Sequence, residues 1–154
     1  MKGIFWNSDG FKDPKKHRFV SDLIKEQNLS FIAISETVRR SFTDPFLRNL
    51  SGGKNFLWHC KEPDGRSGGI LLGVDLNVFD IGGIDEGEFY VKFTLCNKSD
   101  AFKWVLAVVY GPAQVDKKEL FWLSWCSLLV MRLCPSPSAV ILIFLGIKTR
   151  KINL

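Results

Sequence analysis

The chain has 154 residues, of which 46% are hydrophobic and 24% charged, and its formal net charge is +5. This is long enough for one domain with a core of its own, and the absence of repeats, low-complexity stretches and linkers excludes a repeat array. A mild basic excess suits a phosphate-rich partner, although a solvated surface explains the charge equally simply.

The first half of the chain predicts alternating strands and helices. Residues 2–6 form a short apolar run typical of a strand, and residues 31–35 form a second, buried one. Between them, Asp13 and Pro14 are typical of a helix start, and apolar residues on one face extend this helix to about Asn28. Residues 43–50 predict a further short helix that ends at two glycines.

The second half is dominated by strands. Residues 55–60 and 69–76 predict strands around a turn-rich segment, and the alternation at 88–95 is the strongest strand signal in the chain. Residues 102–110 pair back as a hairpin, and a helix is expected over 116–133. Because few helices separate these strands, we expect a mixed α/β (α+β) sandwich rather than a doubly wound parallel sheet.

Secretion and membrane insertion are not expected. The chain has four cysteines, none in a CxxC pair: Cys60, Cys96, Cys126 and Cys134. Reduced thiols in an intracellular protein of the nucleus or cytoplasm are therefore the default. No signal peptide is visible, and the apolar runs 120–131 and 139–145 are shorter than the roughly 20 residues of a membrane span.

Polar residues follow three of the predicted strands. Asn7 and Asp9 follow the first, Glu36 closes the second, and Tyr110 ends the hairpin strand. Polar groups at the carboxyl ends of strands commonly build ligand sites in α/β folds. A carboxylate at Glu36 could hold Mg²⁺ and a phenol at Tyr110 could donate to a phosphate, whereas ordinary turn and strand-end residues are the simpler explanation of each alone.

The glycine-rich segment GRSGG at 65–69 is similar to a phosphate-binding loop only superficially. It lacks the following Lys-Ser/Thr and precedes a strand rather than a helix, which excludes a P-loop. Arg66 could touch a phosphate, but a hairpin turn is the simpler interpretation.

Four motifs together resemble the endonuclease/exonuclease/phosphatase superfamily, and most closely the endonuclease domain of plant non-LTR retrotransposons. They are WNSDGF at 6–11, SET at 35–37, GRSGG at 65–69 and VYGP at 109–112. The resemblance implies a two-sheet sandwich flanked by helices and Mg²⁺-dependent hydrolysis of phosphodiester bonds in DNA. It also implies that Asn7 and Asp9 arrange the active site, that Glu36 and Asp9 hold the metal, and that Tyr110 contacts the scissile phosphate.

The sequence departs from that family after VYGP. The family's Gly-Asp-Phe-Asn motif should follow, but residues 120–154 contain no Asp, Glu or His. Asp75 and Asn77 look similar to that motif but precede VYGP, so we expect them to lie away from Glu36. His17 and His59 also precede VYGP, so neither is carried over as the catalytic base.

We therefore interpret residues 1–125 as a partial nuclease-like domain and residues 126–154 as a divergent tail. The main hypothesis is a truncated retroelement endonuclease with little or no activity. The alternatives are a non-catalytic nucleic-acid-binding remnant and a fragment that does not fold stably. A phosphoinositide or sphingolipid phosphodiesterase is the alternative within the superfamily. Residues 139–145 could add one strand to the shortened second sheet and cover part of its apolar edge.

Overall fold

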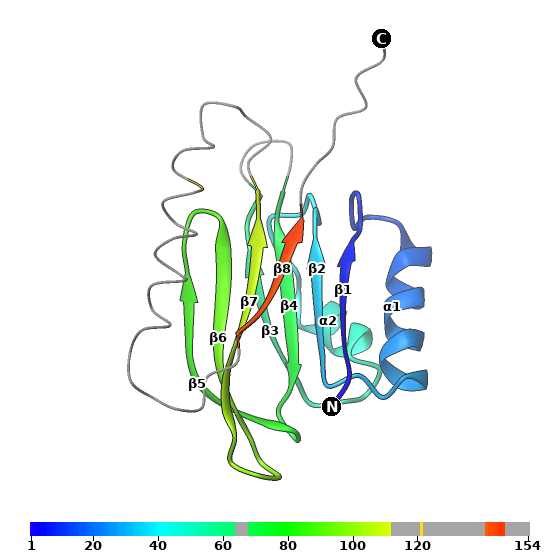
Figure 1. Ribbon diagram of the computed structural model, residues 1–154. Helices are drawn as coiled ribbons and strands as arrows, with labels where there is room; N and C mark the ends of the chain where they lie inside the picture. Colours follow the sequence, from blue (N-terminus) through cyan, green and yellow to red (C-terminus); the bar gives the residue numbers. More distant parts are fainter. Residues whose placement is uncertain (64–67, 112–120, 122–140, 147–154) are drawn as a thin grey trace.

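The computed structural model describes residues 1–63, 68–111, 121 and 141–146, which form two four-stranded sheets and two helices (Figure 1). In chain order the elements are β1 (Gly3–Asn7), α1 (Pro14–Glu26), β2 (Phe31–Ser35), α2 (Asp44–Leu50), β3 (Phe56–Lys61), β4 (Ile70–Asp75), β5 (Phe79–Glu86), β6 (Tyr90–Asn97), β7 (Lys103–Tyr110) and β8 (Ile141–Gly146).

The first sheet has the strand order β1-β2-β4-β3, and the second sheet has the order β5-β6-β7-β8. β1 and β2 run parallel, as do β7 and β8, and every other pair is antiparallel. The carboxyl ends of β1 and β2 therefore lie at the same edge of the first sheet. That edge positions the candidate site.

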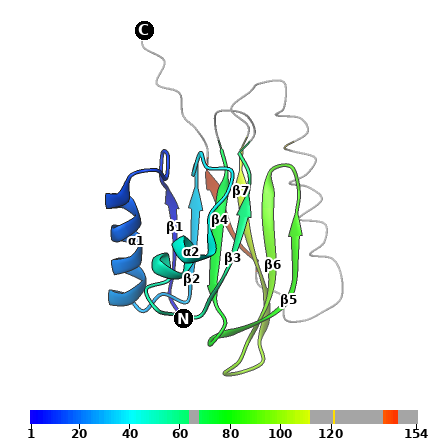
Figure 2. The ribbon, with the colours of Figure 1, turned by 180° about the vertical axis from the view of Figure 1, so that it is seen from behind.

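Both helices cover the outer face of the first sheet (Figure 2). α1 begins where the sequence predicts, because the Asp13 side chain accepts a hydrogen bond from the backbone N–H of Lys15 at 2.8 Å and Pro14 fits the first turn. Val20 and Ile24 of α1 are fully buried against the sheet. The expected helix over 43–50 is present as α2.

The main core lies between the two sheets. Its buried side chains come from both inner faces: Phe31, Ala33, Ile70, Leu72, Val74, Phe79, Val91, Phe93, Leu95, Trp104, Leu106 and Val108. Residues 91, 93 and 95 of β6 supply every second position, which confirms the alternation read from the sequence. Burial of this apolar surface is the largest stabilising contribution to the fold.

The sequence interpretation missed β5. Its pattern does not alternate, and Gly82 and Gly83 interrupt it at a register shift between Ile81 and Gly83. Glycine weakens strand propensity and often marks a bulge, so pairing with β6 decides this strand rather than its own residues.

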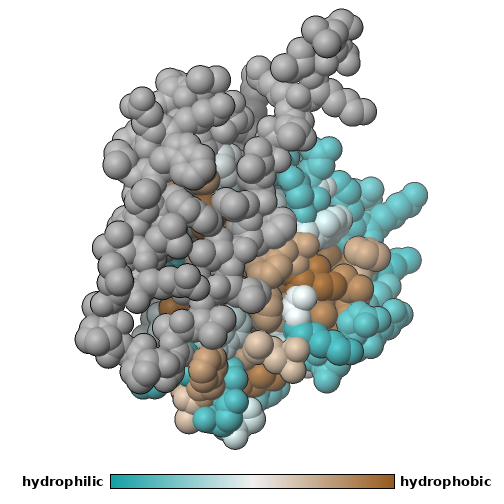
Figure 3. Space-filling view, viewed as in Figure 1, coloured by the Kyte–Doolittle hydropathy of each residue, from teal (hydrophilic) through white to brown (hydrophobic). Residues whose placement is uncertain are grey.

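The apolar tail strand was anticipated: β8 pairs with β7 in parallel, with Tyr110 opposite Gly146. The helix expected over 116–133 falls outside the described residues apart from Phe121, whose ring lies 5.7 Å from that of Phe89. Figure 3 shows apolar surface near the middle of the described part of this face. Neither α1 nor α2, the helices of the described residues, has the length and apolar character of a membrane span.

Candidate functional site

Three strand ends that are distant in sequence meet at one carboxylate. The Asn7 Nδ2 group donates to Glu36 Oε1 at 3.4 Å, and the Tyr110 hydroxyl donates to the same oxygen at 3.0 Å. These residues come from β1, the loop after β2, and β7, so both sheets contribute. The expected convergence of Asn7, Glu36 and Tyr110 is confirmed as geometry.

The loops after β1 and β2 continue to pair beyond the strands. Gly10 N donates to Glu36 O at 2.8 Å, and Phe11 N donates to Thr37 O at 2.9 Å. Glu36 has a φ of +54° and Val38 a φ of +53°, in the left-handed region that side chains other than glycine rarely adopt. Such strain persists only where surrounding contacts impose it, and it gathers at functional sites.

The two glycines that end GRSGG hold the Glu36 loop in place. Gly69 O accepts from Thr37 N at 3.3 Å, and Gly68 O accepts from Val38 N at 3.1 Å. A Cβ on Gly69 would lie 2.5 Å from Thr37 Oγ1, so only glycine fits there. The sequence analysis treated this segment as a turn and missed its packing against the site; Arg66 lies outside the described residues.

Glu36 is 3% exposed and its described hydrogen-bond donors are neutral. Both bonds end on Oε1, and within the described part of the chain no hydrogen bond or ion pair ends on Oε2. Burial, followed by the hydrogen bond to Glu36, raises the pKa of Tyr110. The phenol therefore remains a proton donor at neutral pH.

Asp9 lies two residues after Asn7 and is exposed. Its backbone N–H donates to Asn7 Oδ1 at 3.1 Å, and its φ of +45° is left-handed. Among the residues that the structure describes, no group of three or more His, Cys, Asp or Glu side chains could enclose a metal ion. The arrangement at Glu36 offers one buried carboxylate, and the loop after β1, which pairs with the Glu36 loop, carries Asp9.

The second acidic strand end lies at the opposite end of the first sheet. β4 runs antiparallel to β2, with Ser35 opposite Ile70 and Phe31 opposite Val74, so Asp75 is remote from Glu36. Asp75 Oδ1 accepts from Asn77 N at 2.9 Å. The expectation that Asp75 and Asn77 stand apart from the Glu36 site is confirmed.

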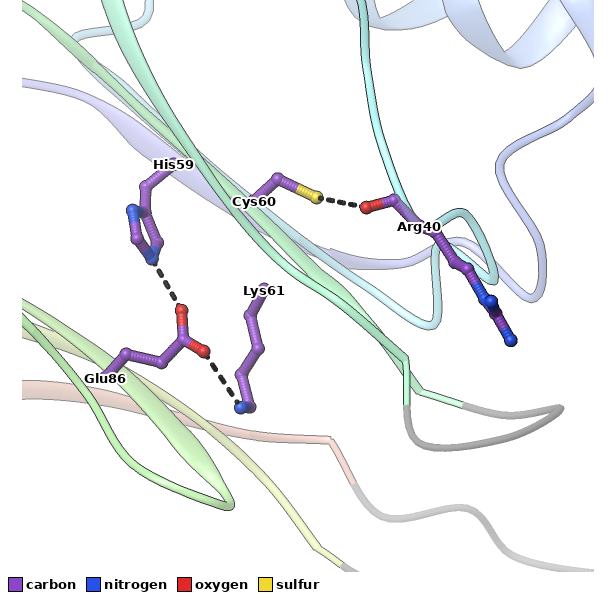
Figure 4. Close-up of polar contacts among 5 residues, drawn as sticks. All are labelled: Arg40, His59, Cys60, Lys61 and Glu86. Atoms are coloured by element: carbon purple, nitrogen blue, oxygen red, sulfur yellow. Dashed lines mark hydrogen bonds and ion pairs between the residues drawn. The ribbon is translucent and has the colours of Figure 1, made fainter.

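Neither histidine reaches the site. His17 Nε2 lies 3.1 Å from Phe11 O, and its ring packs 4.8 Å from that of Phe46. His59 of β3 lies 2.8 Å from Glu86 Oε2 of β5, and Lys61 lies 3.2 Å from the other Glu86 oxygen (Figure 4). This triad links the edges of the two sheets and is structural.

Cys60 does not offer an activated nucleophile. Its thiol points away from the His59 triad toward the carbonyl of Arg40, 3.9 Å away (Figure 4). Burial, with a smaller contribution from Glu62 and Glu86, raises the pKa of the Cys60 thiol to about 11. A thiol that stays protonated at neutral pH is a poor nucleophile and a poor metal ligand.

No family model matches the chain, and no curated protein matches it by sequence. Solved structures do match. An endonuclease/exonuclease/phosphatase family protein from Bacteroides thetaiotaomicron superposes with a TM-score of 0.62 at 7% identity, covering 90% of this chain and 59% of that one. The human Nocturnin catalytic domain, solved with a bound sulfate anion, gives 0.59 at 14% identity, covering 84% and 58%.

TDP2 from D. rerio, solved with a single-strand DNA product, gives a TM-score of 0.60 at 11% identity and covers 92% of this chain and 58% of that chain. The chain thus spans just under three fifths of the length of each of these three proteins. At such low identities the likeness is one of fold. The described part of the chain has the endonuclease/exonuclease/phosphatase fold, with two packed sheets and helices on the outer face of the first.

Proposed function

We propose that this chain is a retroelement-type endonuclease domain that binds Mg²⁺ and a DNA phosphodiester weakly at the Asn7–Glu36–Tyr110 site and hydrolyses it no faster than background. The observation that supports this most directly is the buried Glu36 carboxylate, which receives neutral donors from two other strand ends. In this proposal residues 1–125 are the nuclease-like part and residues 126–154 a divergent tail, within which β8 extends the second sheet.

The donor set fits a hydrated Mg²⁺ ion. Magnesium prefers oxygen ligands and is usually held by one or two carboxylates, with water and substrate phosphates completing its coordination. Glu36 supplies the buried carboxylate, and Asp9 is the second candidate ligand. A bound ion would supply positive charge next to a phosphate.

Two further residues suit a phosphodiester. The Tyr110 hydroxyl keeps its proton at neutral pH because its pKa is raised, so it can donate to a phosphate oxygen when it turns from Glu36 Oε1 to the phosphate. The Asn7 amide offers a second neutral donor from the neighbouring strand end. Donors of this kind stabilise the charge that develops on phosphate oxygens.

Hydrolysis also needs a base that takes a proton from the attacking water. Both histidines of the chain are engaged elsewhere, His17 with Phe11 O and His59 with Glu86. Positioned acid–base groups contribute about 10²–10⁴-fold to such reactions. Without them we expect binding without efficient turnover.

The test combines a supercoiled-plasmid nicking assay with titration of Mg²⁺, on the wild-type chain and on Glu36→Gln. We expect no nicking above background from either protein, and Mg²⁺ binding that the substitution weakens at least about 10-fold, because a neutral amide replaces the buried carboxylate. Glu62→Gln serves as control, since it removes an exposed carboxylate near the end of β3. Robust nicking that Glu36→Gln abolishes would show a complete active site and refute the proposal.

A second candidate function is nucleic-acid binding that does not depend on the metal. Residues 1–60 carry ten Lys and Arg against six Asp and Glu, an excess that suits phosphates. This function predicts DNA binding that falls steeply with salt and persists in Glu36→Gln without Mg²⁺. Binding that needs both Mg²⁺ and Glu36 would favour the first proposal.

A further inference from the structure

Lys16 of α1 reaches back to the loop after β1. Its Nζ group donates to three consecutive backbone carbonyls, at 2.6 Å to Ser8 O, 3.3 Å to Asp9 O and 3.0 Å to Gly10 O. An ammonium group has three N–H donors, so this loop uses all of them. Bonds from a charged donor are stronger than neutral ones.

The loop needs such a partner because its backbone is strained. Asp9 and Gly10 are consecutive left-handed residues, with φ values of +45° and +89°. For a residue other than glycine this conformation costs about 1–2 kcal/mol. It also brings the three carbonyls onto one side, where their mutual repulsion is relieved by a cation.

The same loop fixes the orientation of the Asn7 side chain. The Asp9 N–H donates to Asn7 at 3.1 Å, and only the amide oxygen, Oδ1, can accept it. The amide nitrogen, Nδ2, must then face the other way, where it donates to Glu36 Oε1 at 3.4 Å. Lys16 is thus connected to Glu36 through the loop and Asn7.

We propose that Lys16 is a positioning residue for the Glu36 site, which holds the 8–10 loop so that the Asn7 amide faces the carboxylate. The expected consequence is tighter binding of Mg²⁺ at Glu36, and this consequence rests on the proposed function. Lys16 itself acts through the loop and is not a proposed ligand of the metal or the phosphate. Residues that orient the ligands of a metal typically alter its affinity by 10–100-fold.

Lys15 provides a matched control. It is the preceding residue of α1 and carries the same charge, but its side chain is exposed and makes no hydrogen bond or ion pair within the described residues. Lys16→Met and Lys15→Met therefore remove the same charge from the same helix turn. Only the first removes the contact with the loop.

The primary measurement is the NMR signal of the Asn7 side-chain amide in the metal-free chain. We expect Lys16→Met to shift this signal and to abolish its response to Glu36→Gln, because the amide no longer faces Glu36. Lys15→Met should leave both unchanged. Lys16→Arg retains the charge, but its planar fork cannot donate to three carbonyls around one point, so it should behave like Lys16→Met.

The second measurement is Mg²⁺ affinity, which should fall about 10-fold in Lys16→Met and less than about 2-fold in Lys15→Met. In Lys16→Ala, added methylammonium should restore the Asn7 signal by filling the carbonyl cradle. An Asn7 amide signal that is unchanged in Lys16→Met, or that shifts equally in Lys15→Met, would overturn the inference. Absence of Mg²⁺ binding in the wild type refutes the proposed function instead, and the metal-free amide signal still decides the role of Lys16.

Discussion

Two buried carboxylates lie at opposite ends of the paired strands β2 and β4, and the charges of their partners differ. Glu36 is 3% exposed and Asp75 is 4% exposed. Asp75 lies 3.6 Å from Lys54 Nζ and also accepts a backbone N–H from its own turn. Among the residues that the structure describes, Glu36 receives only the neutral donors of Asn7 and Tyr110.

The comparison separates a structural carboxylate from a candidate functional one. A buried charge is stable when the protein supplies its own counter-charge, and Lys54 does so for Asp75. A buried carboxylate without a paired cation among the described residues can accept one from outside. The backbones differ too, because Glu36 and Val38 are left-handed whereas no residue from 70 to 80 is.

The largest effect is expected from a substitution that tests how tightly the loops pack at the Glu36 end of the first sheet. Gly69→Ala places a Cβ 2.5 Å from Thr37 Oγ1 at a φ of +85°, so strain and overpacking act together. We expect a loss of about 3 kcal/mol in the free energy of unfolding, measured by urea denaturation.

Gly53→Ala is the control at the Asp75 end. Gly53 has nearly the same φ, +88°, but a Cβ there meets nothing within 4 Å. Only the conformational effect remains, about 1 kcal/mol. Equal losses in the two variants would contradict the close packing of the Gly69 segment against the Glu36 loop.

The next prediction exchanges the two carboxylates for amides. Asp75→Asn removes the charged partner of Lys54, whose Nζ also donates to Asn28 Oδ1 and Leu29 O, and should lower the free energy of unfolding by about 1–3 kcal/mol. Glu36→Gln should leave stability unchanged within about 0.5 kcal/mol, because its amide oxygen still accepts from Asn7 and Tyr110 and no cation is left unpaired.

Thermal and urea unfolding of both variants, at neutral pH and without divalent ions, provides the measurement. A strongly destabilised Glu36→Gln would make Glu36 a structural residue like Asp75. The distinction between the two ends of the sheet would then fail.

The sequence predicts the parts of this fold that local signals specify. Alternation identified β6, and Asp13 with Pro14 identified the start of α1. It missed β5, because Gly82 and Gly83 break the pattern and pairing with β6 alone defines the strand. The antiparallel pairing of β4 with β2 places Asp75 at the end of the sheet opposite Glu36. The order of the motifs along the chain had correctly predicted this separation.

The sequence predicted which residues converge at the candidate site, but not the contacts that hold their loops in place. Asn7, Glu36 and Tyr110 stand out because each lies at the carboxyl end of a strand. Lys16 does not, since it lies on a helix among other lysines, and its contact with three carbonyls appears only when the loop is folded. The packing of Gly69 against Thr37 likewise depends on two loops meeting.

The smallest expected effect is the pH dependence that Glu36 confers through Tyr110. Burial and the hydrogen bond to Glu36 raise the pKa of Tyr110 in the folded chain, whereas in the unfolded chain a tyrosine titrates near pH 10. A group whose pKa is raised by folding stabilises fully below its unfolded pKa, and this contribution is lost as pH rises toward the folded value. The wild type should therefore lose stability above about pH 10.

Tyr110→Phe removes that loss along with the hydrogen bond to Glu36, which contributes about 1 kcal/mol at neutral pH. Because Tyr90 also has a raised pKa, owing to burial and a hydrogen bond to Asp85, Tyr90→Phe must be measured beside it. Glu36→Gln should lower the pKa of Tyr110, seen as phenolate absorbance at lower pH, since the carboxylate no longer opposes a second negative charge. Asp75→Asn should leave the tyrosine titration unchanged, because Asp75 lies at the far end of the sheet. The pKa of Tyr110 could instead be unchanged by Glu36→Gln, or change equally in Asp75→Asn. Either result would contradict the electrostatic coupling between Tyr110 and Glu36.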